Sequence, residues 1–459
     1  MALLGLALLL AGNWILPLID RDEPRFAEAS REMLQRRDFI VPHFNGDYRF
    51  DKPPLIYWCQ AASYCALGEN AFAARLPSAV FATGTALLLL FWGARLGQAR
   101  VGLYAALMFV TCLQILAYGR MAIADMPMIF FFAAAVWAGW EMARERGGGM
   151  TRWWWMFYAS LGLGFLAKGP EAWLPLAGLW VVCWFRPWSF RVNGAGMIIG
   201  LLLSAAIVMA WAAPALAATQ GEFFRVGIGR HVIHRSLGAM EGHGASGWIG
   251  YLALLPLYFV TFFASFFPWS IWAPAALKKG ATDDLPFYLL TQAAIVFALF
   301  TLAATKLPHY TLPAFPCLAL WLAFHLDEQQ IRRAVAVQVA LLMVALCGFW
   351  FLNRHLLAVS IWRKAGPSVR PATRVASVDF HEPSLVWEFR RVSTNYVDFI
   401  DLAGAQFFWR QPGPRCLIIP TKNFDMGQFI PAANASIERV TGTDTASFRR
   451  WDVIVLTRK

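Results

Sequence analysis

The chain has 459 residues, of which 58% are hydrophobic and 15% are charged, and its formal net charge is +12. Soluble domains average about 45–50% apolar residues, so the composition excludes an ordinary soluble enzyme and indicates a membrane protein. The basic excess does not indicate a nucleic-acid partner, because no basic stripe interleaved with aromatic residues stands outside the apolar runs.

Apolar runs of about 18 residues or more recur along the chain and predict transmembrane helices. Each run must be helical, because lipid offers no partner for free backbone amides. We therefore predict a mainly α, polytopic fold with about eleven transmembrane helices. They cover residues 2–19, 72–93, 101–118, 127–143, 153–168, 171–185, 195–217, 251–274, 285–304, 308–325 and 332–352.

Basic residues in the short loops set the expected orientation, since cytoplasmic loops are enriched in Arg and Lys. If the first span runs outward, the outer short turns hold only Arg120, Lys168 and Lys306. The inner loops then hold Arg95, Arg100, Arg144, Arg146, Arg152, Arg186, Arg191, Lys278, Lys279, Arg332 and Arg333. We expect the N-terminus inside and the C-terminus outside.

Three polar segments then share the outer face: residues 20–71, residues 218–250 and everything after about 353. This divides the chain into a membrane domain, residues 1–352, and a small outer α/β domain, residues 353–459. Within the outer domain, short apolar runs predict buried strands at Val375–Phe380, Cys416–Ile419 and Val453–Leu456.

The first outer segment is dense in mixed charge, since residues 20–38 carry six acids and five bases. Asp22 or Glu23 can cap a helix that has Pro24 in its first turn. Apolar side chains share one face of that helix, and polar ones fill the other: Arg25, Glu28, Arg31, Glu32 and Gln35. We expect an amphipathic helix lying in the membrane interface, either as a plain surface helix or as part of an active site.

Ionisable residues also stand at the other outer turns. Lys52, in the rigid Asp51-Lys-Pro-Pro turn, is a point charge suited to a phosphate. Asp125 lies two residues before a proline and is either a helix N-cap or a site residue. Lone charges at helix ends usually snorkel, yet five of these residues gather on one side of the membrane. We predict one carboxylate-and-cation cluster, in which a carboxylate can take the proton of a bound hydroxyl: Asp22, Lys52, Asp125, Lys168 and Lys306.

The second outer segment, residues 218–250, mixes glycines with three histidines and three arginines. We interpret it as a mobile cover that binds an anionic acceptor or carrier, with His231 and Arg235 as candidate contacts. A solvated basic loop without a ligand is one alternative. A metal pair formed by His231 and His234 is the other.

Four short motifs occur in a fixed order along the membrane domain: Asp22-Glu23-Pro24-Arg25, Lys52-Pro53-Pro54-Leu55, Ala124-Asp125-Met126-Pro127 and Lys168-Gly169-Pro170. As an ordered set, this pattern resembles the membrane glycosyltransferases of the GT-C superfamily. It is most similar to the bacterial aminoarabinose transferase branch, which is related to the protein O-mannosyltransferases. The resemblance covers roughly residues 1–350 and a Glu382-Pro-Ser-Leu-Val stretch in the outer domain.

The resemblance implies an enzyme of the bacterial inner membrane that takes a sugar from a polyprenyl phosphate carrier at the outer face. The sugar passes, with inversion, to a lipid or glycolipid acceptor such as lipid A. By similarity, Asp22 engages the acceptor or acts as a base, Asp125 is the second acid, and Arg25 and Lys52 hold the carrier phosphate. We add further candidate substrate contacts: Glu23, Asp51, Arg120, Lys168, His231, Arg235, Lys306, His309 and Tyr310.

The sequence departs from this branch in two ways, since Asp51 stands where Glu is usual and the chain is shorter. These departures leave the sugar and the acceptor open. No Cys or His spacing requires a metal, although an Asp-rich divalent-cation site is an alternative. Rival functions are a transporter or flippase of a lipid-linked sugar, a protein O-mannosyltransferase-like enzyme and a non-catalytic lipid-binding protein. A transporter should carry ionisable residues in mid-membrane, where this chain has few.

Overall fold

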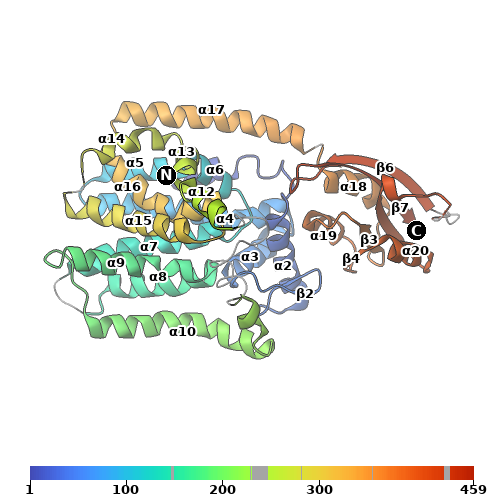
Figure 1. The fold of residues 1–459 in the computed structure, drawn as a ribbon, viewed down its shortest axis with the longest axis horizontal. Helices are drawn as coiled ribbons and strands as arrows, with labels where there is room; N and C mark the ends of the chain where they lie inside the picture. The colour runs from blue at the N-terminus through green and yellow to red at the C-terminus, as the bar shows by residue number, and fades with distance from the viewer. Residues whose placement is uncertain are drawn as a thin grey trace.

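The computed structural model describes residues 1–145, 149–227, 229, 247–280, 282–353, 355–427, 429 and 435–458. Figure 1 shows two parts, a bundle of helices and a domain built on a β-sheet at one end of that bundle. The last bundle helix, α17 (Glu328–Leu352), runs along the edge of the bundle and leads toward the sheet domain.

Six helical segments of the described residues are long and apolar enough to cross a membrane. One of them, Trp248–Ser265, is composed of α12 (Gly247–Ala253) and α13 (Leu257–Ser265). The other five are α4 (Ala71–Arg95), α7 (Asp125–Arg144), α10 (Gly194–Ala218), α15 (Asp284–Leu302) and α17. Their length and composition agree with the predicted membrane domain.

The remaining predicted spans are also helical, but they are shorter or broken. They correspond to α1 (Ala2–Leu10), α5 (Ala99–Thr111) with α6 (Leu113–Tyr118), α8 (Arg152–Lys168), η1 (Pro170–Trp173) with α9 (Leu174–Phe185), and η4 (Pro308–Ala314) with α16 (Phe315–Ala323). Two short elements, η3 (Trp269–Trp272) and α14 (Ala273–Leu277), follow α13. The mainly α prediction is confirmed, whereas the count of eleven spans stays a prediction.

Prolines explain several of these breaks. Pro170 and Pro308 each occupy the first position of a 3-10 helix, and Pro256 is the N-cap of α13. A proline lacks the amide hydrogen that an interior helix position must donate, so it is tolerated at a helix start and interrupts a longer helix.

Close packing of α7, α8 and η1 depends on a glycine in α8. A Cβ atom on Gly164 would lie 2.8 Å from the Cβ of Ala172 in η1 and 3.3 Å from the Cβ of Phe131 in α7. Gly169 then takes φ +107°, which favours glycine, and lets the chain turn from α8 into η1. The two glycines bring the end of α8 close to the start of α7.

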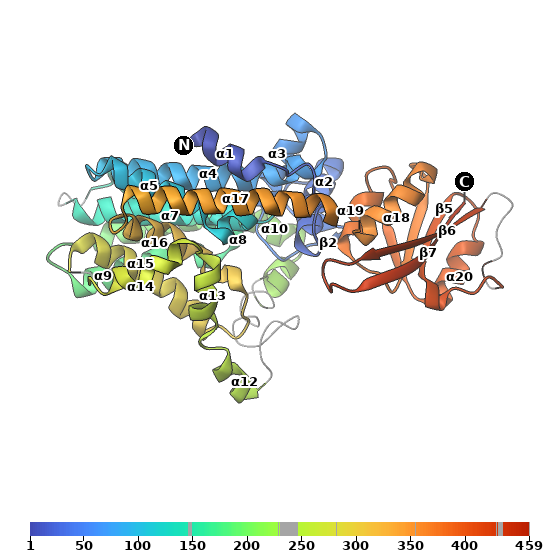
Figure 2. The same cartoon turned by 90° about the horizontal axis from the view of Figure 1, so that it is seen from above.

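The first outer segment forms three elements between the bundle and the sheet domain (Figure 2). These are α2 (Asp22–Arg36), a two-stranded antiparallel ribbon of β1 (His43–Phe44) and β2 (Asp47–Tyr48), and α3 (Leu55–Leu67). α2 falls where the sequence predicted an amphipathic helix. Its N-cap is Arg21, without a side-chain cap hydrogen bond, so the interpretation of Asp22 or Glu23 as the cap is wrong.

The surroundings of α2 also differ from the expectation of an interfacial helix. Glu28, Arg31 and Glu32, which lie on its polar face, are all buried, as are most of its apolar residues. The sheet domain covers the polar face, a contact between residues that stand more than 350 positions apart in the sequence. The helix is therefore enclosed between two parts of the protein.

The sheet domain contains five strands in the order β4-β3-β5-β7-β6. β3 (Arg374–Val378) pairs in parallel with β4 (Val397–Ile400) and β5 (Arg415–Pro420), whereas β7 (Arg450–Arg458) is antiparallel to β5 and β6 (Ala435–Thr443). The helices are α18 (Leu357–Ala365), α19 (Pro383–Phe389) and α20 (Leu402–Arg410), with short 3-10 turns at Gly366–Ser368 and Thr421–Asn423.

Both faces of this sheet are covered, which is typical of parallel α/β arrangements. Cys416 and Ile418 of β5 pack in the layer that contains α18 and α19. Leu417 and Ile419 of the same strand pack with Phe408 of α20 on the opposite face. The sequence predicted the three central strands, which are buried on both faces, and missed the two edge strands β4 and β6.

Candidate functional site

A buried ion pair joins the start of α7 to the end of α8. Lys168 Nζ donates a hydrogen bond to Asp125 Oδ1 at 2.9 Å, and both side chains are less than a tenth exposed. Asp125 lies in the first turn of α7, whose N-cap is Ala124. Its carboxylate therefore neutralises Lys168 instead of capping the helix, and the N-cap alternative for Asp125 is wrong.

A second carboxylate, which the sequence analysis missed, contacts the same lysine. Glu171 Oε1 lies 3.1 Å from Lys168 Nζ, three residues further along the chain. The signal was present in Lys168-Gly-Pro-Glu171, because a glycine turn of this length can return a carboxylate to the lysine. Buried charges require close partners of opposite sign, and Lys168 has two.

Aromatic residues from α6 and η4 line the same region. The hydroxyl of Tyr118 lies 3.0 Å from Nδ1 of His309. Lys168 Nζ lies 5.6 Å from the centre of the Tyr310 ring, close enough for a cation–π interaction. His309 and Tyr310 therefore lie in the same region as Lys168, while their expected contact with substrate stays a prediction. Tyr118 is an addition that no sequence motif indicated.

The first outer segment contributes charge to this region. Lys52 and His309 both interact electrostatically with Asp125, and Asp22 interacts with Tyr118. Of the five residues of the predicted carboxylate-and-cation cluster, Asp125 and Lys168 are in direct contact, and Lys52 and Asp22 act on the same region electrostatically. We refer to these four residues with Glu171, Tyr118, His309 and Tyr310 as the polar cluster.

Arg49 anchors the turn that carries Lys52. Its Nε donates to the hydroxyl of Tyr57 at 3.0 Å, and its Nη1 lies 2.8 Å from Asp51 Oδ2. The guanidinium also stands 5.0 Å from the centre of the Phe26 ring on α2. Burial raises the pKa of Tyr57 to about 12 although Arg49 opposes the shift, so this phenol remains protonated near neutral pH. Asp51 is thus placed as a partner of Arg49 beside Lys52.

Glu23 has a different environment from the one the sequence predicted. It is fully buried, and its two oxygens accept hydrogen bonds from Arg75 Nε and Nη2, both at 2.8 Å. The backbone amides of Ile19 and Ala122 also donate to this carboxylate. We therefore assign Glu23 a structural role, fastening the start of α2 to α4 and to the turn before α7, in place of the expected substrate contact.

Arg120 and Lys306 satisfy backbone carbonyls at helix ends. Arg120 donates to Leu8 and Ala11 at the end of α1. Lys306 donates to Phe300, Thr301 and Ala303 at the end of α15, at 2.8 Å for Ala303. Basic side chains commonly serve helix C-termini in this way, so Arg120 and Lys306 have a structural role, and Lys306 is not assigned to the cluster. Contact of either residue with substrate stays a prediction.

The other predicted site residues are less constrained. Asp22 is exposed at the start of α2, and Arg25 is half-buried and interacts electrostatically with Glu382 of the sheet domain. His231, His234 and Arg235 lie outside the described residues.

Within the described residues, one group of three carboxylates has the spacing of a cation site. Asp20, Glu382 and Asp444 offer oxygens that lie within 4.8 Å of one another. Asp20 also accepts hydrogen bonds from the amide of Ser384, at 2.7 Å, and from its hydroxyl. This group joins the chain before α2 to the sheet domain, and no sequence spacing indicated it because its members come from distant segments.

The sequence is similar to that of known membrane glycosyltransferases. The family model described as dolichyl-phosphate-mannose-protein mannosyltransferase matches residues 51–214. The chain is 30% identical over 392 residues to the undecaprenyl phosphate-alpha-4-amino-4-deoxy-L-arabinose arabinosyl transferase of Edwardsiella ictaluri, covering 81% of this chain and 68% of the relative. It is 33% identical to a second enzyme of that name from Sodalis glossinidius, covering 70% of this chain and 58% of the relative.

The fold has a counterpart among solved structures. The crystal structure of ArnT from Cupriavidus metallidurans bound to undecaprenyl phosphate aligns with a TM-score of 0.76 at 16% sequence identity. The alignment covers 98% of this chain and 96% of that protein, so the bundle and the sheet domain both have counterparts.

Proposed function

Because the chain belongs to the family of the undecaprenyl phosphate-aminoarabinose arabinosyl transferases, we propose that the polar cluster transfers an amino sugar from undecaprenyl phosphate to a lipid A-type acceptor. The chain is a multi-pass membrane glycosyltransferase that uses a polyprenyl-phosphate-linked sugar. The nature of the sugar and the roles of individual residues form the proposal. Family membership also favours a transferase over a transporter or a lipid-binding protein.

The buried Asp125–Lys168–Glu171 group is the observation that carries the proposal. Three charges held together at one end of α7 and α8 give a fixed electrostatic frame. Such a frame needs little reorganisation when charge moves during a reaction, which is the usual basis of electrostatic catalysis. Lys52 and Asp22 belong to the first outer segment and border this frame, and we propose that they contact the substrates.

The reaction we propose is a single displacement at the anomeric carbon. An acceptor oxygen forms a bond to that carbon while the bond to the carrier phosphate oxygen breaks, and the phosphate leaves with the electron pair. Lys52 and Arg25 hold the phosphate and stabilise its growing negative charge. Asp22 takes the proton if the acceptor is a hydroxyl and orients the acceptor if it is already a phosphate. The displacement inverts the anomeric centre.

The proposed place of this reaction is the periplasmic side of the bacterial inner membrane. The distribution of Arg and Lys in the short loops supports an external position for the polar cluster and for the sheet domain. The carrier lipid would reach the cluster from the surrounding bilayer, because Asp125 lies in the first turn of α7, a helix long and apolar enough to cross a membrane. We propose that no metal ion is required.

A reconstituted transfer assay tests this function. The purified protein is incubated in lipid nanodiscs with undecaprenyl phosphate-aminoarabinose and lipid A, and the product is followed by mass spectrometry. We expect lipid A to gain the sugar only when both substrates are present, with and without EDTA. Transfer from a mannosyl carrier to a peptide would indicate the mannosyltransferase activity named by the matching family model, and movement of intact donor without transfer would indicate a flippase.

A further inference from the structure

We propose that a buried ion-pair clasp, formed by Glu28, Arg31 and Arg390, makes the sheet domain a positioning element for α2 and so for Asp22 and Arg25. The inference rests on the proposed function, because it assigns the clasp an effect on the transfer reaction. Glu28 and Arg31 belong to α2, and Arg390 follows α19 of the sheet domain. None of the three residues belongs to the polar cluster.

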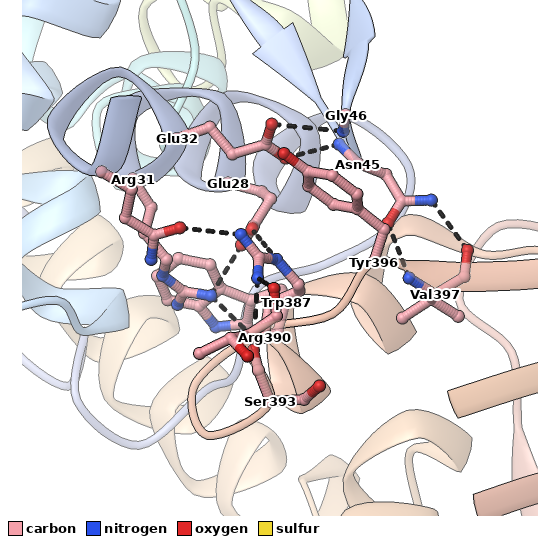
Figure 3. A network of polar contacts seen from close by, with 12 residues as sticks. Glu28, Arg31, Glu32, Asn45, Gly46, Trp387, Arg390, Ser393, Tyr396 and Val397 are labelled. Carbon is pink, nitrogen blue, oxygen red and sulfur yellow. Dashed lines mark hydrogen bonds and ion pairs between the residues drawn. The ribbon is translucent and has the colours of Figure 1, made fainter. Parts of the chain in front are cut away.

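The three charges are close together and removed from water (Figure 3). Arg31 Nη1 donates to Glu28 Oε2 at 2.6 Å, and Arg390 Nε lies 3.4 Å from Glu28 Oε1. The side chains of Glu28 and Arg31 are 0% exposed, and that of Arg390 is 5% exposed. A carboxylate in such a place depends on its two arginines, since water cannot replace either of them.

Each arginine also bonds to groups on the other side of the interface between α2 and the sheet domain. Arg31 Nη1 donates to the carbonyl of Trp387 at 3.2 Å, and its guanidinium lies 3.7 Å from the centre of the Trp387 ring. Arg31 Nε lies 3.0 Å from Glu69 Oε2, just beyond α3. The clasp therefore joins α2 to the sheet domain and to the segment after α3 at once.

Arg390 reaches in the opposite direction, from the sheet domain to α2. Its Nη2 donates to Gln35 Oε1 at 2.7 Å, and its Nη1 donates to the carbonyls of Ser393 and Thr394 at 3.2 and 2.8 Å. The planar guanidinium thus bonds to its own domain and to α2 through separate nitrogens. A lysine in its place would supply the charge but not the two separate donor nitrogens of the planar guanidinium.

A second connection runs in parallel with the clasp. Glu32 of α2 accepts a hydrogen bond from the amide of Gly46 at 3.2 Å and another from the amide of Asn45. The Asn45 side chain exchanges two hydrogen bonds of 2.9 Å with the backbone of Val397 in β4. Figure 3 shows these residues on the same side of α2 as the clasp.

The opposite face of α2 is in contact with the polar cluster. Phe26, Ala29 and Met33 pack with Ile123 and Ala124, the two residues directly before Asp125. In a helix, residues three or four positions apart share a face. Asp22 therefore shares this face, whereas Glu28 and Arg31 point to the sheet domain. Because α2 is one continuous helix, loss of the clasp would let Asp22 and the turn before Asp125 shift together.

Such a shift is expected to slow the reaction far more than it weakens carrier binding. A misplacement of about 1 Å in a reacting geometry can cost roughly 100-fold in rate. We predict that Arg390→Gln lowers kcat about 10- to 100-fold, with a small change in KM for the donor. Arg390→Lys should recover part of the rate. Glu28→Gln combined with Arg390→Gln removes both charges of the Glu28–Arg390 pair and leaves neither partner unpaired. This double variant should therefore fold even if the single variant does not.

Arg391→Gln is the matched control, because Arg391 pairs with Glu388 in the same domain at 3.0 Å but is 46% exposed. Hydrogen–deuterium exchange of α2 supplies a readout that requires no substrate. Faster exchange over residues 22–36 in the Arg390 variants, but not in Arg391→Gln, together with the lowered kcat, supports the clasp. Unchanged exchange, or a wild-type kcat in folded variants, overturns it. If the wild-type protein transfers no sugar but the Arg390 substitutions still speed exchange over residues 22–36, the proposed function is refuted and the contact between the clasp and α2 is not.

Discussion

Lys168 lies between two carboxylates, and this pairing explains why the polar cluster tolerates so much buried charge. Asp125 and Glu171 approach its ammonium within 2.9 and 3.1 Å. With both acids ionised, the three residues carry a net charge of −1 that faces Lys52 and His309. Lys52, the proposed phosphate contact, is therefore placed beside a fixed negative charge.

Asp125→Asn removes one of the two charges that hold Lys168. We expect the rate of sugar transfer to fall on the order of 100-fold or more, and we also expect a lower Tm. Breaking a buried pair costs about 3–5 kcal/mol, although Glu171 should reduce this loss. Initial rates and thermal melting in detergent measure the two effects. Asp425→Asn, at an exposed acid of the sheet domain, is the control; a wild-type rate in Asp125→Asn would exclude Asp125 from the reaction.

Lys52→Ala should weaken carrier binding. A charge-assisted contact to a phosphate contributes enough that its loss lowers affinity roughly 10- to 100-fold. Lys52→Arg should retain part of the affinity, because the charge remains while the shape differs. Binding of undecaprenyl phosphate to the purified variants gives the comparison, with exposed Lys422→Ala as the control. Equal affinities in all of these proteins would remove Lys52 from the phosphate site.

At the scale of elements, α2 illustrates what the sequence could predict. Its apolar and polar faces were evident from residue spacing, and so was its place after the first apolar run. Its burial was not predictable, because the partner of its polar face comes from residues 387–397, far along the chain. Buried salt bridges and exposed ones have the same sequence pattern, and only the fold distinguishes them.

The same reasoning applies to α7 and α8. The predicted topology placed Asp125 and Lys168 at the same membrane face, and their motifs suggested a shared site. The 2.9 Å contact depends on close packing at Gly164 and on the conformation of Gly169, which no spacing rule gives. Arg49 and Tyr118 belong to no motif, so their contacts could not be predicted from the sequence. The edge strands β4 and β6 were missed because their residues are largely half-exposed.

Asp20, directly before α2, predicts a pH dependence of stability. Burial raises the pKa of Asp20 to about 7; hydrogen bonds from Ser384 oppose the shift, and Glu382 and Asp444 add to it. In the unfolded chain the pKa returns to its ordinary value of 3.8. Between about pH 4 and pH 7, Asp20 is therefore protonated in the folded state and ionised in the unfolded state. Its contribution to the free energy of unfolding is fully present below about pH 4 and is lost as the pH rises through 7.

Thermal melting of the wild type and of Asp20→Asn between pH 5 and 8 tests this expectation. The stability of the wild type relative to the variant should fall over that range, by an amount on the order of 2 kcal/mol. The asparagine cannot titrate, so other acids cancel in the comparison. Melting curves that shift in parallel for both proteins would contradict a raised pKa at Asp20.

At the scale of the whole molecule, the sheet domain and the polar cluster should face the same side of the membrane. Figure 2 shows α2, α3 and the β1–β2 ribbon between the bundle and the sheet domain. α2 contacts both the residues before Asp125 and Trp387 of the sheet domain. A periplasmic site therefore requires a periplasmic sheet domain, and one orientation experiment examines both.

Single cysteines in a Cys-free background can determine this orientation. Asp425→Cys lies at an exposed position of the sheet domain, and Lys279→Cys lies at an exposed position after α14. We expect an impermeant thiol reagent that enters the periplasm to label Asp425→Cys in intact cells, but not Lys279→Cys until the inner membrane is opened. The reverse pattern would invert the topology and place the cluster in the cytoplasm.

The initial rate of sugar transfer by Asp22→Asn, relative to the wild type, tests the central claim most directly. Asp22 is the exposed acid of the polar cluster and does not cap its helix, so the substitution should leave the Tm near the wild-type value. With a hydroxyl acceptor, loss of the base should lower the rate on the order of 100-fold or more while the donor still binds. A folded Asp22→Asn protein that transfers sugar to lipid A at the wild-type rate would contradict the assignment of this site.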